Sequence, residues 1–108
     1  MQKFTEIFKL RDLLDEAGVP HEFINRSAMF CGITAYQICY PCYDHKKQVC
    51  SAVQNPISYG KEADLIEIMG LLTPEEKEID MVKGYLTAED VASRIIGHWN
   101  SLPASERK

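Results

Sequence analysis

The run ITAYQICY, residues 33–40, decides the fold, because it is rich in β-branched and aromatic residues and indicates a strand. The run QVCSAVQ, residues 48–54, has the same character, and the polar segment PCYDHKK, residues 41–47, joins the two. Two strand-like runs with so short a connection predict an antiparallel hairpin. HEFIN, residues 21–25, is a candidate third strand, so we expect a two- or three-stranded antiparallel meander.

Helices are predicted before and after this meander in the sequence. Between residues 4 and 17 the apolar side chains recur at steps of three and four, and Gly18 supplies a helix stop. A second helix is predicted over residues 61–72, because apolar residues there fall at i, i+3, i+4 and i+7. These residues are Leu65, Ile68, Met69 and Leu72.

Two helix-start patterns follow. Thr73 precedes a proline and has Glu76 three residues later, and Thr87 has Asp90 in the equivalent place. The first of these helices is expected to be short, because Gly84 interrupts it. The sequence therefore predicts an α+β fold: an N-terminal helix, the meander, and then two or three helices packed on the sheet.

The whole chain has the size and composition of one folded domain. It contains 108 residues, of which 45% are hydrophobic and 26% are charged. We expect a single α+β domain over residues 1–100 and a flexible polar tail over residues 101–108. No secretion signal and no run of roughly 18 apolar residues is evident, so a cytoplasmic location is expected.

The net charge of −4 disfavours general nucleic-acid binding, which needs a basic surface. The order of helix, three strands and helix is shared with double-stranded-RNA-binding domains. Those domains place basic residues at the start of the last helix, whereas this chain has Thr87, Ala88, Glu89 and Asp90 there. RNA binding is therefore rejected, although that topology stays open.

Several motifs between residues 58 and 95 carry a resemblance. They are SYG, LIEIMGLLT, EE, and GYLTAEDV followed by RI. In these motifs the chain resembles a family of small uncharacterised proteins of Firmicute phages and prophages. The resemblance implies an accessory protein in the host cytoplasm, and it supplies no catalytic residue or mechanism.

The cysteines offer a candidate metal site. Cys39, Cys42, His45 and Cys50 form a C-x2-C-x2-H-x4-C pattern whose ligand types suit tetrahedral zinc. The short spacing before the histidine and the position of two cysteines inside strand-like runs favour buried free thiols instead. We therefore expect no metal and no other cofactor.

Catalytic patterns are weak. Cys31 is a candidate nucleophile with His21, His45 or His98 as its base, but nothing in the sequence pairs them. The acidic pairs at residues 75–76 and 89–90 are explained by helix capping. No catalytic residue is predicted, and an enzyme of unknown class is the third choice of function.

A small-ligand site is predicted at Ser58, Tyr59 and Gly60, ahead of the expected helix over residues 61–72. A helix start offers free backbone amides to an anion, and Tyr59 would stack on a ring. Arg26, or the same loop of a second subunit, is expected to complete the site. The structural alternative is a plain turn in which Ser58 acts as a cap.

Two groups of residues are candidates for protein binding. The acidic residues Glu75, Glu76, Glu78 and Asp80 would fit a basic groove. Tyr36 and Tyr40 would form an interface if their strand face is exposed, and would be core residues if it is buried.

The function expected from the sequence is stoichiometric binding without turnover. The expected partner is a host protein with a basic surface, such as a bacterial defence nuclease. The alternative is a sponge that sequesters an anionic, nucleotide-like ligand, with a homodimer as the candidate oligomer. No membrane partner is expected.

Overall fold

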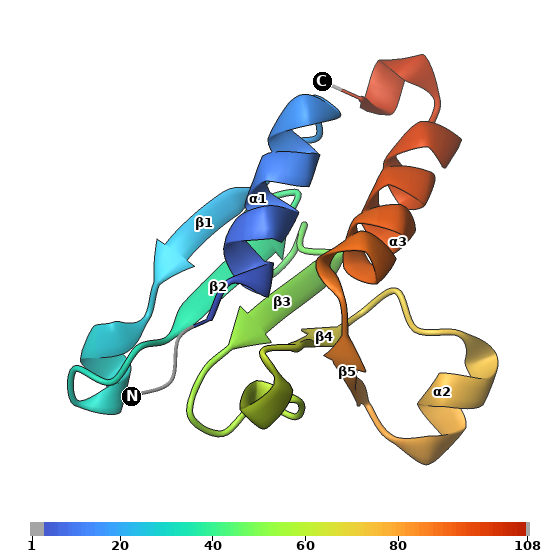
Figure 1. Ribbon diagram of the computed structural model, residues 1–108. Coiled ribbons are helices and arrows are strands. Elements are labelled where there is room, and N and C mark those ends of the chain that lie inside the picture. Colours follow the sequence, from blue (N-terminus) through green and yellow to red (C-terminus); the bar gives the residue numbers. More distant parts are fainter. Residues whose placement is uncertain (1–3, 108) are drawn as a thin grey trace.

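The computed structural model describes residues 4–107, so the first three residues of the predicted domain and Lys108 of the predicted tail lie outside it. The fold is α+β, as predicted, with one five-stranded antiparallel sheet (Figure 1). Its strands are neighbours in the order of the chain. They are β1 (Glu22–Asn25), β2 (Tyr36–Tyr40), β3 (Cys50–Gln54), β4 (Ile66–Met69) and β5 (Val82–Leu86). The predicted hairpin and third strand are confirmed, but the sheet has two more strands than the sequence indicated.

Helix α1 (Glu6–Glu16) forms where the apolar spacing predicts it, and it buries Ile7, Leu10 and Leu14. Gly18 follows the helix with a φ of +69°, a conformation that glycine adopts without strain. The first turn is capped by a distant residue: the carboxylate of Asp64 accepts hydrogen bonds from the Thr5 hydroxyl and, at 2.8 Å, from the Thr5 N–H.

The predicted helix over residues 61–72 is wrong. A short 3-10 turn, η2 (Lys61–Ala63), is followed by strand β4, in which Ile66 and Ile68 are buried on one face and Met69 is exposed on the other. Asp64 and Gly70 bound the strand with φ values of +55° and +92°, which a helix cannot contain.

The two helix-start patterns are confirmed. Helix α2 (Pro74–Ile79) begins with a complete capping box between Thr73 and Glu76. Helix α3 (Ala88–Ser101) begins where the Thr87 hydroxyl accepts a hydrogen bond from the Asp90 N–H. The prediction that Gly84 interrupts the first of these helices is wrong, because α2 already ends at Ile79 and Gly84 lies within β5.

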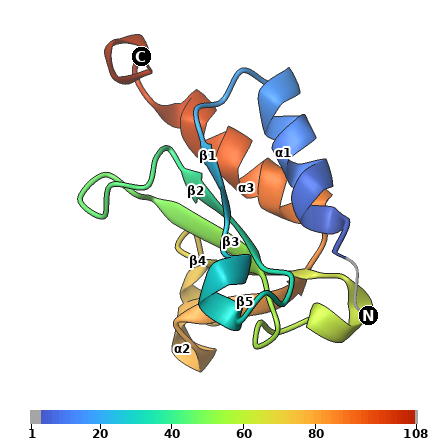
Figure 2. The same ribbon diagram turned by 90° about the vertical axis from the view of Figure 1, so that its left-hand side faces the viewer.

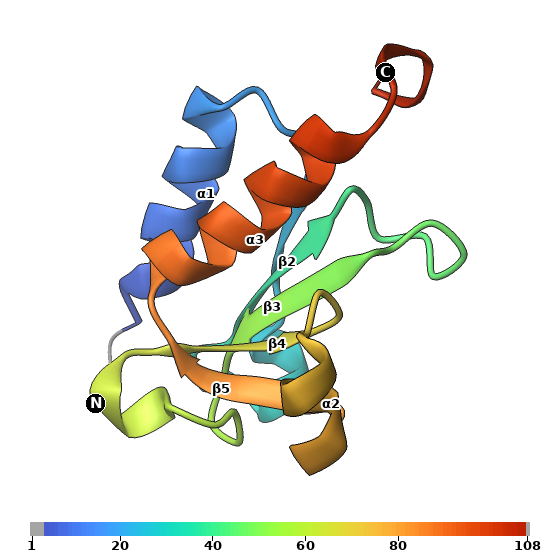
Figure 3. The same ribbon diagram turned by 90° about the vertical axis from the view of Figure 1, so that its right-hand side faces the viewer.

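Helices α1 and α3 lie side by side on one face of the sheet (Figures 2 and 3). Their apolar sides pack against Ile38, Ala52 and Ile68, which share that sheet face. Successive strand residues point to opposite faces, so Gln37, Val53 and Met69 lie on the face that α1 and α3 do not cover. We call this second face the open face.

The C-terminal residues are partly helical. Ser101 belongs to α3, and a 3-10 turn, η3 (Ala104–Glu106), occupies part of the segment predicted as a flexible tail. Across residues 4–107, none of the helices combines the length and the apolar character that crossing a bilayer requires.

Candidate functional site

The segment of residues 73–81, which we call the α2 lobe, carries the most exposed large apolar side chain of the described chain. Ile79 is 87% exposed and Met81 is 74% exposed. Glu75, Glu78 and Asp80 are exposed beside them. The lobe lies at the β5 edge of the sheet and projects from it, away from α1 (Figure 1).

Glu76 has a structural role within this lobe. Its Oε1 and Oε2 accept hydrogen bonds from Nη1 and Nη2 of Arg94, each at 2.7 Å. These bonds, together with one from the Thr73 N–H, lower the pKa of Glu76 to about 2. Of the four acids predicted to meet a partner, Glu76 must be removed, because its carboxylate is already engaged and only 18% of its side chain is exposed.

The predicted tyrosine interface needs the same correction. Tyr40 is buried, and its hydroxyl forms a 2.7 Å hydrogen bond with Nδ1 of His98 on α3. Tyr36 is partly buried, and its ring packs edge-on against Phe8, with ring centroids 4.7 Å apart. Both tyrosines belong to the helix-covered face of the sheet, so the core alternative is the correct one.

The predicted anion site at residues 58–60 lacks its physical basis. No α-helix begins there, and two of the three backbone amides have partners: the Ser58 N–H donates to Asn55 O, and the Tyr59 N–H donates to the Glu67 carboxylate at 2.9 Å. A carboxylate therefore occupies the position expected for the anion. Ser58 is buried, and its Oγ accepts from the Asn55 N–H and donates to the Asn55 carbonyl, so the segment is a turn. The helix cap that the alternative assigned to Ser58 is wrong, because no α-helix follows it.

Arg26 lies elsewhere, on the open face. Its guanidinium stands over the ring of Tyr43, 5.0 Å from the centroid, and its Nε donates to Gln37 Oε1 at 2.9 Å. Arg26, Gln37 and Tyr43 are among the residues that line a pocket of about 240 Å³. Ser58, Tyr59 and Gly60 do not line it, although Asn55 does.

The strand register separates the candidate zinc ligands. Cys39 pairs with Ser51, whereas Cys50 pairs with Tyr40, so the two thiols lie on opposite faces of the sheet. No group of three metal-ligating side chains forms within residues 4–107. All four cysteines have free thiols; burial raises the pKa of Cys39, and it raises the pKa of Cys50 to about 12.

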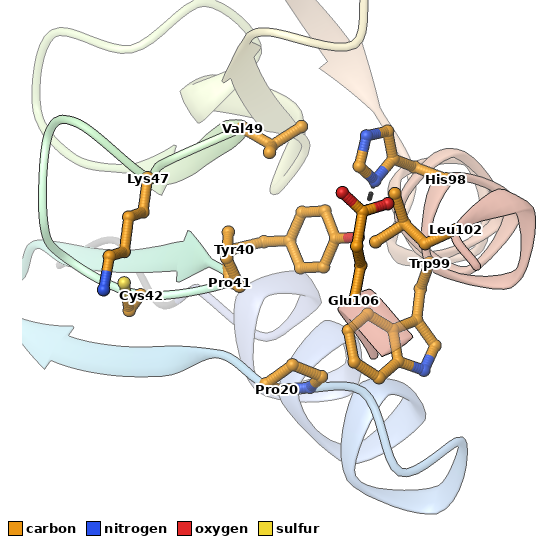
Figure 4. A pocket seen from close by; sticks show the side chains of 10 residues that line it. All are labelled: Pro20, Tyr40, Pro41, Cys42, Lys47, Val49, His98, Trp99, Leu102 and Glu106. Atoms are coloured by element: carbon orange, nitrogen blue, oxygen red, sulfur yellow. Dashed lines mark hydrogen bonds between the residues drawn. The ribbon is translucent and has the colours of Figure 1, made fainter. Parts of the chain in front are cut away.

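A second pocket, of about 300 Å³, lies between the β2–β3 connection and the end of α3 (Figure 4). Its lining is mostly apolar and includes Tyr40 and Trp99, and His98, Lys47 and Glu106 add polar groups. Burial raises the pKa of Tyr40, so its phenol stays protonated at neutral pH. Sequence reasoning missed this pocket, because the residues that line it come from four separate segments.

The second pocket does not assemble a nucleophile and a base. The Cys42 thiol and the His98 ring lie on opposite sides of it (Figure 4). Cys31 is exposed in the turn after η1 (Ser27–Phe30). In the described part of the chain, no histidine forms a hydrogen bond with it, so the candidate nucleophile Cys31 has no hydrogen-bonded histidine base there.

Comparisons of the chain with protein-family models, with curated proteins and with solved structures found no match.

Proposed function

We propose that the protein is a non-enzymatic phage or prophage accessory protein that binds a host protein stoichiometrically and blocks it. The observation that carries this proposal is the exposed pair Ile79 and Met81, set among acidic side chains on the α2 lobe. The resemblance of residues 58–95 to Firmicute phage proteins supports the biological setting.

The chemistry of the lobe specifies its partner. Two large apolar side chains gain free energy only when a partner removes them from water, by about 25 cal/mol per Å² of apolar surface. The acids Glu75, Glu78 and Asp80 would steer the lobe towards a basic surface and exclude acidic ones. A groove with basic walls and an apolar floor satisfies both requirements, and nucleic-acid-cleaving enzymes have basic grooves. A bacterial defence nuclease is therefore the proposed target.

The lobe is also held in place, which favours tight binding. The Arg94 fork and the capping box fix both ends of the first turn of α2. A binding element that is already ordered loses less conformational entropy when it docks. The lobe therefore suits a protein that works by occupying a groove.

The test is phage plating on Firmicute cells that carry a nuclease-based defence system. Expression of the protein should restore plating of a defence-sensitive phage. The double variant Ile79→Asp, Met81→Asp should abolish this rescue, because it replaces both apolar contacts with charges. The matched control is Ile57→Asp, since Ile57 is an isoleucine that is 76% exposed outside the lobe.

Titration of the purified nuclease should then reach its endpoint near one protein per binding site. Inactivation of many nuclease molecules by one molecule of the protein would show turnover and contradict the proposal. So would full rescue by the double variant.

A further inference from the structure

Arg26 differs from the other arginines that the structure describes. Arg11 and Arg94 form ion pairs with Asp12 and Glu76, and Arg107 is exposed to solvent. Arg26 is partly buried, and among residues 4–107 no acidic side chain pairs with it. A guanidinium that is partly removed from water without a counter-charge favours the arrival of an anion.

A chain of hydrogen bonds holds this guanidinium still. Arg26 Nε donates to Gln37 Oε1 at 2.9 Å, and Gln37 Nε2 donates to Ser51 Oγ at 2.7 Å. The chain crosses the open face from the end of β1 to β3. Stacking on the Tyr43 ring fixes the guanidinium plane from another direction.

The outer nitrogens of the guanidinium stay available. Within the described residues, the only acceptor near Nη1 is the Met29 thioether at 3.8 Å, and sulfur is a weak acceptor. The carboxylate of Glu22 accepts a hydrogen bond from the Tyr43 N–H, so it holds the loop that carries the stacking ring. Two outer nitrogens in one plane can bond two oxygens of a phosphate group.

The pocket beside Arg26 has room for one ring. Its volume is about 240 Å³, and the aromatic residues Phe30 and Tyr43 are among those that line it. Aromatic rings and a guanidinium plane stack well on a planar ring, and a nucleobase has such a face.

We propose that this pocket binds a small nucleotide-like anion, with a phosphate group on Arg26 and a planar ring against the aromatic lining. The site is independent of the α2 lobe, because it lies at the β1–β2 side of the sheet and the lobe lies at the β5 edge. The protein would thus sequester a small ligand through one end of the sheet and bind a protein through the other.

The test is a titration with 5′-AMP in which isothermal calorimetry and NMR amide chemical shifts measure binding. AMP should bind with a dissociation constant of about 10 μM to 1 mM. The shifted amides should include those of Arg26, Gln37 and Tyr43. Adenosine and inorganic phosphate should each bind at least tenfold more weakly than AMP, because each supplies only half of the contacts.

Three variants decide the role of Arg26. Arg26→Gln and Arg26→Lys should both weaken AMP binding at least tenfold, since neither offers a two-pronged contact. The matched control is Arg11→Gln, because Arg11 also stands over an aromatic ring, 5.2 Å from the centroid of Phe8. Thermal melting monitors folding, and the lysine variant keeps the charge if the glutamine variant does not fold.

Three results would each overturn the proposal. The first is no binding of AMP to the wild-type protein at about 10 mM, a concentration that detects even weak sites. The second is wild-type affinity in both Arg26 variants, and the third is equal affinity for inorganic phosphate and AMP. Loss of phage rescue has no bearing on these measurements, so failure here and failure of the α2 lobe remain distinguishable.

Discussion

Arg94 binds both carboxylate oxygens of Glu76, with Nη1 to Oε1 and Nη2 to Oε2 at 2.7 Å each. The same guanidinium donates from Nη1 to the Leu71 carbonyl at 3.0 Å. Arg94 therefore ties the middle of α3 to the segment that enters α2 and to the first turn of α2 itself. Because α2 has only six residues and packs mainly on β5, we expect these bonds to contribute to the order of the lobe.

Replacing Glu76 with glutamine should lower the free energy of unfolding by about 1–3 kcal/mol, the range for a hydrogen bond to a charged group. The variant keeps the shape of the side chain but loses the charge and one of the two acceptor oxygens. Urea unfolding measures the change. Glu78→Gln is the control, because Glu78 is exposed on the same helix, and it should change the free energy by less than about 0.5 kcal/mol.

The same fork should make stability depend on pH. The pKa of Glu76 is about 2 in the folded protein and ordinarily 4.5, so the folded state favours the charged form. The stabilisation is complete above pH of about 4.5 and is lost as the pH falls through about 2. Unfolding curves of the wild type and of Glu76→Gln should therefore converge between these values. A constant difference between the two proteins down to pH 2 would contradict the assignment.

Local signals in the sequence predicted the elements that depend on local interactions. Helix α1, the hairpin of β2 and β3, and the starts of α2 and α3 follow from spacing and capping residues. Strand β4 was missed, because Leu65, Met69 and Leu72 complete a helical spacing around it. Only the antiparallel pairing of β4 with β3 resolves that ambiguity in favour of the alternation of Ile66 and Ile68.

In the candidate sites, too, the sequence indicates the residue types, whereas tertiary packing determines their contacts. The acids of the α2 lobe are visible in the sequence, but the engagement of Glu76 by Arg94 depends on how α3 packs. Arg26 was recognised as a cation, whereas its stacking on Tyr43 depends on the folding of the β2–β3 connection over the open face. Which side chains stay exposed is decided by tertiary packing, which residue spacing does not encode directly.

Two of the four thiols should react readily in the native protein, and the other two should be protected. Cys31 is exposed and Cys42 is partly buried, whereas Cys39 and Cys50 are buried. Burial raises the pKa of Cys50 to about 12, so its reactive thiolate is scarce at neutral pH. Ellman's reagent should modify Cys31 first and Cys42 more slowly in the native protein, and all the thiols after unfolding.

Metal analysis complements that measurement. Because the Cys39 and Cys50 side chains lie on opposite faces of the sheet, we expect the purified protein to carry no stoichiometric zinc. One zinc per chain that is lost in Cys42→Ser would contradict this prediction, and so would protection of Cys42 from the reagent until a chelator is added.

Gly84 and Gly97 should respond in opposite directions to replacement by alanine. A Cβ on Gly84 would lie 2.2 Å from the Tyr59 Cβ and 2.7 Å from the Tyr59 carbonyl oxygen, so the backbone of β5 and the turn that carries Tyr59 would have to separate. Overpacking of this kind costs about 1–3 kcal/mol. Gly97 lies exposed in α3 with nothing within 4 Å of a Cβ, and alanine there should add up to about 1 kcal/mol through helix propensity. Urea unfolding of both variants measures the two effects, and an unchanged stability of Gly84→Ala would show that the turn does not pack on β5.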